Sequence, residues 1–510
     1  MHKNIVRLIL AAVAGLFILN LAVSLQWRIQ HDTSILLYIT WLMDRFGSVP
    51  YRDIFDINMP GTYLFYYLIG KLSGYTDLGV RCVDLAMLAG ILFMSWQWMK
   101  KFGRHVALCG SILWGLCYLS LGPNSSLQRE YLILLPVLGA VLIADRNPEQ
   151  KTGLKSSAVG FLFGIAALLK PPAAIAFAFL VFYQFWEAGK GRLIRQVVLP
   201  AVLGFIVPVG CMMLYLYSRG ALAAFIDMAW NYLPLYVHLT GNHEALSGIE
   251  WMKYLSWETL ILGGFSVWLI PSAIGVYVSY RRATVTDRQK RQLKLLIILA
   301  VCYAFYPTIS GQFWDYHYLL FLYFAAQLSS FCIMELSPHT DGGENLRPSV
   351  VFLIFILIWF RPGEYVLGAV MGRGVPPVRN GRVDAIAGFL SEHLQPGDAV
   401  QPLDWTGGAV NAMFIAKARL ATPFVYDFYF YHDTSNAYIH GLRREFIEDL
   451  HQSRPRFIVE VTGRDKPWVF GENTTAEFGE LESILDTSYT EVSRGNGYSI
   501  LQIRNSSGAK

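Results

Sequence analysis

The chain has 510 residues, of which 54% are hydrophobic and only 15% are charged. Soluble domains carry about 25% charged residues, so this composition excludes an ordinary soluble protein and indicates many membrane-spanning segments. The formal net charge of +5 is too small for a nucleic-acid-binding surface, and we expect no nucleic-acid partner.

Long apolar runs recur from the N-terminus to about residue 370. A membrane-spanning helix needs roughly 20 mostly apolar residues, and about eleven runs come near this length. The first is expected to stay as an anchor and not to be cleaved as a signal peptide. The runs lie near residues 5–25, 78–98, 105–121, 130–144, 155–169, 171–187, 195–217, 258–280, 293–309, 316–335 and 349–370.

The segments between these runs predict the orientation of the chain. Those at 99–105, 187–195 and 281–294 are rich in Lys and Arg, and alternating runs place all three on one side. The positive-inside rule makes that side cytoplasmic. The opposite, outer side then receives residues 27–77, Lys170, the segment 218–257 and everything after about residue 371.

Residues 372–510 are polar, and helical patterns alternate there with short strand patterns. Helices are expected at 383–394, 435–452 and 478–489, and strands at 397–404, 454–462 and 497–505. This alternation predicts a small α/β domain. We therefore predict a polytopic α-helical membrane domain at 1–371 and an extracytoplasmic α/β domain at 372–510.

The first outer segment is unusually acidic for a membrane protein. Asp32 follows the first apolar run by about one helical turn, and residues 33–46 form an amphipathic pattern. That pattern, and a second at 62–72, predict helices lying in the membrane interface. Asp32 is a candidate catalytic carboxylate, with a helix N-cap as the alternative. Asp53 and Asp56 could bind an acceptor, hold a divalent cation or form salt bridges, but we predict no metal site.

Basic side chains at the outer ends of the apolar runs are candidate phosphate ligands. A lysine at membrane depth is costly unless it is paired, so Lys170 is a functional candidate, and snorkelling to the interface is the alternative. The other candidates also have structural alternatives, which are ion pairs with acidic neighbours or a hydrogen-bonded structural histidine. They are Arg81, Arg129 and His317.

Several motifs in their order resemble the membrane-integral glycosyltransferases of the C superfamily, which include bacterial aminoarabinose transferases and protein O-mannosyltransferases. An acid after the first run is followed six residues later by Tyr38. The chain departs from the family at His31-Asp32-Thr33, where relatives carry adjacent acids, and at Met59-Pro60-Gly61, where Pro-Pro is frequent. These departures leave the acceptor class and metal dependence open. The remaining motifs are PYRD (50–53), NMPG (58–61), VRCVDLAMLAG (80–90), FLFGIAALLKPPAA (161–174) and GQFWDYHYLLFLYF (311–324).

The resemblance implies an inverting transfer of a sugar from a polyprenyl-phosphate donor to a lipid, glycan or protein of the envelope. The reaction would take place on the outer face of a bacterial inner membrane, with residues 372–510 in the periplasm. Asp32 would be the general base, because the attacking hydroxyl must lose a proton. Lys170, with Arg81, Arg129 and His317, would bind the donor phosphate. The alternatives are an envelope polysaccharide polymerase or ligase, and a non-enzymatic transporter of lipid-linked sugars.

Overall fold

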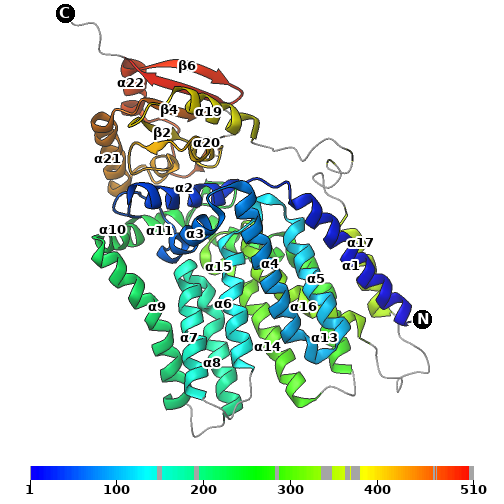
Figure 1. Cartoon of the computed structure of the whole chain (residues 1–510). Coiled ribbons are helices and arrows are strands. Elements are labelled where there is room, and N and C mark those ends of the chain that lie inside the picture. Colours follow the sequence, from blue (N-terminus) through cyan, green and yellow to red (C-terminus); the bar gives the residue numbers. More distant parts are fainter. Residues whose placement is uncertain are drawn as a thin grey trace, which may run out of the picture. The chain divides into compact units, whose positions relative to one another are not determined.

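The structure of the chain, a computed structural model, describes residues 2–145, 152–188, 194–281, 286–334, 347–361, 368, 371, 380–462, 466 and 468–504. It is mostly helical, with a small sheet formed by residues near the C-terminus (Figure 1). Internal contacts divide the chain into two compact units. Unit 1 comprises Met1–Arg28, Asp77–Met212 and Tyr254–Pro376, and unit 2 comprises Ile29–Thr76, Met213–Lys253 and Pro377–Lys510.

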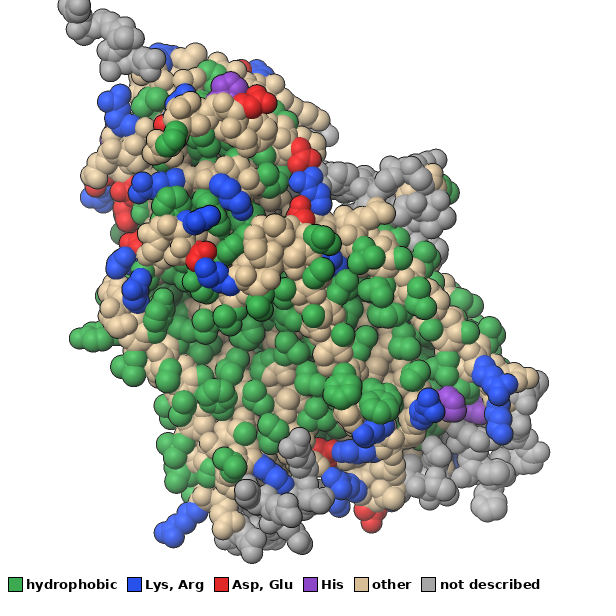
Figure 2. Space-filling model, in the orientation of Figure 1, with side chains coloured by type: hydrophobic (Ala, Val, Ile, Leu, Met, Phe, Trp, Pro, Cys, Tyr) green, Lys and Arg blue, Asp and Glu red, His purple; other side chains and the backbone are tan. Residues whose placement is uncertain are grey.

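The helices of unit 1 coincide with the expected apolar runs. They include α1 (His2–Ser24), α4 (Asp77–Met99), α5 (Arg104–Ser120), α6 (Arg129–Ala144), α7 (Thr152–Leu169), α8 (Ile175–Ala188), most of α9 (Leu199–Ser218), α13 (Leu269–Arg281), α14 (Asp287–Ala304), α16 (Leu319–Ser329) and α17 (Arg347–Trp359). Figure 2 shows hydrophobic side chains over these helices, with Lys and Arg gathered near their lower ends.

Seven helical segments of the described chain are long and apolar enough to cross a membrane. They are His2–Ser24, Asp77–Phe102, Thr152–Leu169, Ile194–Ser218, Gly248–Arg281, Asp287–Ser310 and Asp315–Ile333. The prediction of a polytopic helical membrane protein is therefore confirmed. The count of about eleven crossings stays a prediction, because helices such as α5, α6 and α17 are shorter than a full span.

Glycines let two helices of unit 1 approach backbone to backbone. A Cβ atom on Gly160 of α7 would lie 1.8 Å from the carbonyl oxygen of Ala201 on α9. A Cβ atom on Gly204 of α9 would lie 2.0 Å from the carbonyl oxygen of Ser157. Small residues at such crossings are typical of membrane helices, where close packing replaces the hydrophobic effect. The glycine-rich segment before Lys170 thus fixes α7 against α9.

The sheet of unit 2 has the order β3-β2-β4-β7-β6. β2 (Ala399–Leu403) pairs in parallel with β3 (Arg419–Leu420) and β4 (Phe457–Val461), while β7 (Tyr498–Ile503) is antiparallel to β4 and to β6 (Tyr489–Gly495). The helices of this part are α19 (Asn380–His393), α20 (Ala409–Ala416), α21 (Ala437–Ser453) and α22 (Gly479–Ser488).

The expected mixture of helices and strands is therefore present in the C-terminal part. The division at residue 371 stays a prediction, because residues 372–379 lie outside the described ones and unit 2 also takes in earlier segments. The outer segment 218–257 is structured, with α10 (Leu222–Asp227), α11 (Leu233–Tyr236), β1 (Glu244–Ala245) and the start of α12 (Gly248–Ile261). β1 pairs in parallel with β5 (Phe470–Gly471).

The first outer segment forms α2 (His31–Phe46) and α3 (Pro60–Ser73), both in unit 2. α2 is buried from Thr33 to Leu42 and packs against α3 and α20. The helix expected over residues 33–46 is therefore present, and its place in a membrane interface stays a prediction. Its polar face can be buried because the hydroxyls bond to the helix's own backbone. Ser34 donates to the carbonyl of His31 at 2.7 Å, and Thr40 donates to that of Leu37 at 3.1 Å.

Candidate functional site

The Pro171-Pro172 pair determines where Lys170 lies. A proline disfavours helical dihedrals in the preceding residue, and Lys170 has extended ones, with φ −153° and ψ 120°. α7 therefore ends at Leu169. Lys170 follows directly after it, so a positive charge lies at the end of an apolar helix.

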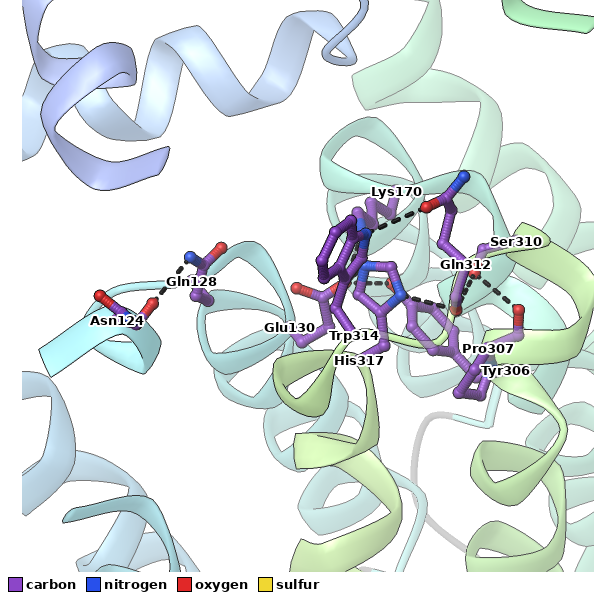
Figure 3. A network of polar contacts seen from close by, with 10 residues as sticks. All are labelled: Asn124, Gln128, Glu130, Lys170, Tyr306, Pro307, Ser310, Gln312, Trp314 and His317. Atoms are coloured by element: carbon purple, nitrogen blue, oxygen red, sulfur yellow. Dashed lines mark hydrogen bonds and ion pairs between the residues drawn. The ribbon is translucent and has the colours of Figure 1, made fainter. Parts of the chain in front are cut away.

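Lys170 lies in a polar network with residues from three other parts of unit 1 (Figure 3). Its Nζ donates to Oε1 of Glu130 at 2.5 Å and to Nε2 of His317 at 2.7 Å. The hydroxyl of Tyr306 in α15 (Tyr306–Ser310) also donates to Oε1 of Glu130, at 3.0 Å. The side chains of Glu130, His317 and Lys170 are only 0%, 2% and 15% exposed. The lysine thus points to buried partners and does not snorkel to an interface.

The carbonyl of Gln312 fixes the tautomer of His317. Its oxygen lies 2.8 Å from Nδ1, so Nδ1 carries the proton and donates to it. Nε2 is then an acceptor for the ammonium of Lys170. His317 therefore contributes a neutral imidazole to the network, and the indole of Trp314 donates to the side-chain oxygen of Gln312 at 3.0 Å.

Arg129 adds a second cation to the network. It is close enough to interact electrostatically with both Glu130 and His317. Two cations and one carboxylate give the network one net positive charge. A net positive charge attracts the negatively charged oxygens of a phosphate. Oε2 of Glu130 is buried and accepts no hydrogen bond from the described residues.

Arg81 lies in a separate network of unit 1. It forms an ion pair with Asp84, both residues being buried, and it donates to the hydroxyl of Ser24 at 2.5 Å. The hydroxyls of Tyr118 and Ser126 donate to the same carboxylate at 2.6 and 2.7 Å. The ion pair between Arg81 and Asp84 is the structural alternative that the sequence offered. The hydrogen bonds around it connect α1, α4, α5 and the turn before α6. The structure does not bring Arg81 together with Lys170, and its phosphate role stays a prediction.

Asp32 lies in the first turn of α2, in unit 2. The N-cap is Gln30, so the alternative of Asp32 as the N-cap was wrong by two residues. Oδ1 of Asp32 is 3.1 Å from Nδ1 of His31, and the two side chains are 19% and 20% exposed. His31 has a φ of +55°, which is strained for a residue with a side chain. Asn411 of α20 holds the segment by donating to the carbonyl of Ile29 at 3.0 Å.

The other two acids of the first outer segment are engaged by neighbours within unit 2. Asp53 accepts from Arg52 and from the backbone N–H of Val49, each at 2.8 Å, and the bond from Arg52 lowers its pKa. Asp56 is fully buried and accepts from Tyr63 at 2.7 Å and from Asn58 at 2.8 Å. These contacts support structural roles for both acids, while acceptor binding stays a prediction.

Within the described ranges, no group of three or more His, Cys, Asp or Glu side chains is arranged to hold a metal ion. Asp53 has bonds from Arg52, and Asp56 is enclosed by hydroxyl and amide donors, which are not metal ligands in that orientation. The contacts of these two acids therefore favour hydrogen bonding over coordination of a divalent cation.

Glu130 and Tyr306 are the members of the Lys170 network that were not among the candidate residues. A sequence signal existed for Glu130, because it begins an apolar run at the same predicted outer side as Lys170. Two opposite charges at one depth of a membrane protein are expected to pair. No such signal existed for Tyr306, since tyrosines are common throughout the apolar runs.

Two solved structures have a fold similar to that of this chain. The crystal structure of ArnT from Cupriavidus metallidurans bound to undecaprenyl phosphate matches at a TM-score of 0.59 and 13% identity, covering 99% of this chain and 99% of that chain. The apo state of the same protein matches at a TM-score of 0.56 and 14% identity, covering 98% of each chain. No protein-family model and no curated protein matches the sequence. The chain therefore has the fold of ArnT, the fold predicted from its resemblance to the C superfamily of glycosyltransferases.

Proposed function

We propose that the chain is a glycosyltransferase that moves a sugar from a polyprenyl-phosphate donor to an envelope lipid, glycan or protein. The reaction takes place on the outer face of the bacterial inner membrane, with the C-terminal part in the periplasm. The observation that carries the proposal is the network of Lys170, Glu130 and His317, because it holds a cation at the end of apolar helices. A second support is the fold shared with a protein crystallised with undecaprenyl phosphate.

The proposed reaction is a single displacement with inversion. The acceptor oxygen attacks the anomeric carbon, while the bond from that carbon to the phosphate oxygen breaks. The acceptor proton passes to a carboxylate, and the polyprenyl phosphate leaves with the negative charge. Asp32 is the proposed base, because it is a partly exposed carboxylate in the first turn of a helix.

Lys170 is the proposed ligand of the donor phosphate, with Arg129 beside it and His317 positioning the ammonium. The network has one net positive charge before the donor binds, and the phosphate would neutralise it. Glu130 offsets the cost of burying Lys170 while the site is empty. The roles of Asp32 and Lys170 belong to different units of the chain, and each is tested separately.

The test uses the purified chain in lipid nanodiscs with radiolabelled polyprenyl-phosphate sugars and extracted envelope acceptors. Wild type is compared with Asp32→Asn and with Asp44→Asn, a matched control on the same helix whose carboxylate bonds to Lys71. We expect transfer by wild type and by the control, and a loss of about 100-fold or more in Asp32→Asn.

Two outcomes would contradict the proposal in different ways. Normal transfer by Asp32→Asn would show that Asp32 is not the general base, and the proposal of a transferase would stand. Failure of wild type to consume any donor, while it moves labelled donor across vesicle membranes, would instead establish a transporter of lipid-linked sugars.

A further inference from the structure

Leu127 lies in a strained turn of unit 1, directly before α6. Its φ is +56°, in the left-handed region that a bulky side chain rarely adopts. Such a conformation persists only where the surrounding contacts hold it in place. The turn follows the short 3-10 helix Pro123–Ser125, and Arg129 and Glu130 come immediately after it as the first two residues of α6. The direction of these two charged side chains therefore depends on the contacts that hold the turn.

The carboxylate of Asp84 holds the turn at two successive residues. Ser126 donates to its Oδ2 at 2.7 Å. Leu127 is connected to it through Tyr118, whose hydroxyl accepts from the backbone N–H of Leu127 at 3.0 Å and donates to Oδ1 of Asp84 at 2.6 Å. Asp84, Tyr118 and Leu127 are all fully buried. Hydrogen bonds in such surroundings are strong, and a polar group there that loses its partner is costly. The network around Asp84 therefore stabilises the strained turn.

Contacts on both sides of the turn fix the start of α6 as well. The hydroxyl of Tyr131 donates to the backbone carbonyl of Asp84 at 3.0 Å. The ring of Tyr131 stacks on that of Tyr118, with 4.1 Å between the centroids and 7° between the planes. Before the helix, the side chain of Gln128 donates to the carbonyl of Asn124 at 2.9 Å (Figure 3). The two charged residues at the start of α6 thus lie within a segment that is held at both ends.

We propose that Asp84 is a positioning residue for Arg129 at the donor phosphate site. It acts through the turn, which sets the direction in which the guanidinium of Arg129 leaves α6. Charge-assisted hydrogen bonds to phosphate are directional, so a small displacement of the cation weakens them. The inference rests on the proposed function, because it requires that Arg129, beside Lys170, binds the donor phosphate. It gives the network around Asp84 a role in donor binding without contact to the donor.

The test measures equilibrium binding of radiolabelled undecaprenyl phosphate to the full chain in nanodiscs. Tyr118→Phe removes the hydroxyl that connects Asp84 to the turn and keeps the stacked ring. Tyr323→Phe is the matched control, because it also removes a fully buried hydroxyl of unit 1, which shares a hydrogen bond of 2.8 Å with Ser95. We expect Tyr118→Phe to bind about tenfold more weakly than wild type, and the control to bind within about twofold of wild type.

A double-mutant cycle with Arg129→Gln separates positioning from a general loss of stability. If the turn acts by directing Arg129, Tyr118→Phe should change the affinity of the Arg129→Gln variant by less than about twofold, because the cation that it directs is already gone. Thermal unfolding confirms that each variant is folded. Ser126→Ala removes the direct bond to Asp84 and should weaken binding in the same way, so it replaces Tyr118→Phe if that variant does not fold.

The outcomes distinguish this inference from the proposed function. Binding by Tyr118→Phe as tight as by wild type would overturn the inference and leave the proposed function standing. An equal loss in Tyr323→Phe, or a loss of the same size with and without Arg129, would assign Tyr118 to general stability and would also overturn the inference. If wild type does not bind undecaprenyl phosphate, the proposed function is overturned, and this inference with it.

Discussion

The ammonium of Lys170 and the carboxylate of Glu130 meet at 2.5 Å, although 40 residues separate them in the sequence. Because the carboxylate is fully buried, each charge depends on the other to remain inside the protein. The pair therefore has a structural role that must be separated from any role in binding phosphate.

Lys170→Met should lower the free energy of unfolding by about 3 kcal/mol, because it leaves the carboxylate of Glu130 buried without its cation. Glu130→Gln/Lys170→Met should recover most of this stability, since no uncompensated charge remains. Thermal unfolding in detergent measures both effects.

If Lys170 binds the donor phosphate as proposed, the affinity for a polyprenyl phosphate should not recover together with the stability in the double variant. The double variant should still bind it about tenfold or more weakly than wild type, because a charge-assisted hydrogen bond to phosphate is lost. If the stable double variant binds the lipid phosphate as tightly as wild type, Lys170 is a structural cation only.

The buried carboxylate of Asp56 predicts a second stability effect, in unit 2. Tyr63→Phe removes a hydrogen bond of 2.7 Å from this carboxylate and should cost about 1–3 kcal/mol. Tyr67→Phe is the control on the same helix, because its hydroxyl makes only a long, partly buried bond to Asp44. Thermal unfolding should distinguish the two variants, and equal midpoints would contradict the structural assignment of Asp56.

The close approach of α7 and α9 predicts a third effect. Gly160→Ala would bring a methyl group within 1.8 Å of a backbone carbonyl on α9, so the two helices must separate. Overpacking of this kind should cost about 1–3 kcal/mol. Gly210→Ala on α9 is the control, because no atom lies within 4 Å of its new methyl group. A Gly160 variant as stable as the control would show that these helices do not pack through their glycines.

The helices and strands were largely predictable from local patterns. The apolar runs predicted the helices of unit 1, and short apolar stretches such as Phe457–Val461 predicted the strands near the C-terminus. Local patterns do not report tertiary contacts, however. α2 is buried partly because Tyr38 donates to the carbonyl of Ala418, which is 380 residues away, and no pattern within residues 33–46 contains this information.

The candidate site was predictable only in part, for the same reason. Lys170 and His317 were identified because charge at membrane depth is unusual, and the structure brings them within 2.7 Å of each other. Arg81 had the same signal, but its charge is used by Asp84 within one helical turn. A charge pattern in the sequence therefore predicts which side chains need a partner. It does not predict which residue the partner is, because the partner depends on the tertiary structure.

His243 predicts a pH effect on the stability of the segment 240–247. Burial, followed by repulsion from His31, lowers the pKa of His243 from 6.5 to about 4, and its ring lies 4.3 Å from that of Trp405. The unfolded chain thus takes up a proton on this histidine at a higher pH than the folded chain does. The stability contributed by the neutral imidazole is therefore complete above about pH 6.5 and is lost as the pH falls toward 4.

His243→Gln has no such titration, so wild type should lose stability relative to the variant by on the order of 2 kcal/mol across this range. The measurement is the midpoint of thermal unfolding for both proteins between pH 7 and pH 4. Parallel curves for the two proteins would mean that His243 is equally easy to protonate in the folded and unfolded states. A gap that instead widens in favour of wild type on acidification would reverse the sign and place an uncompensated negative charge beside the ring.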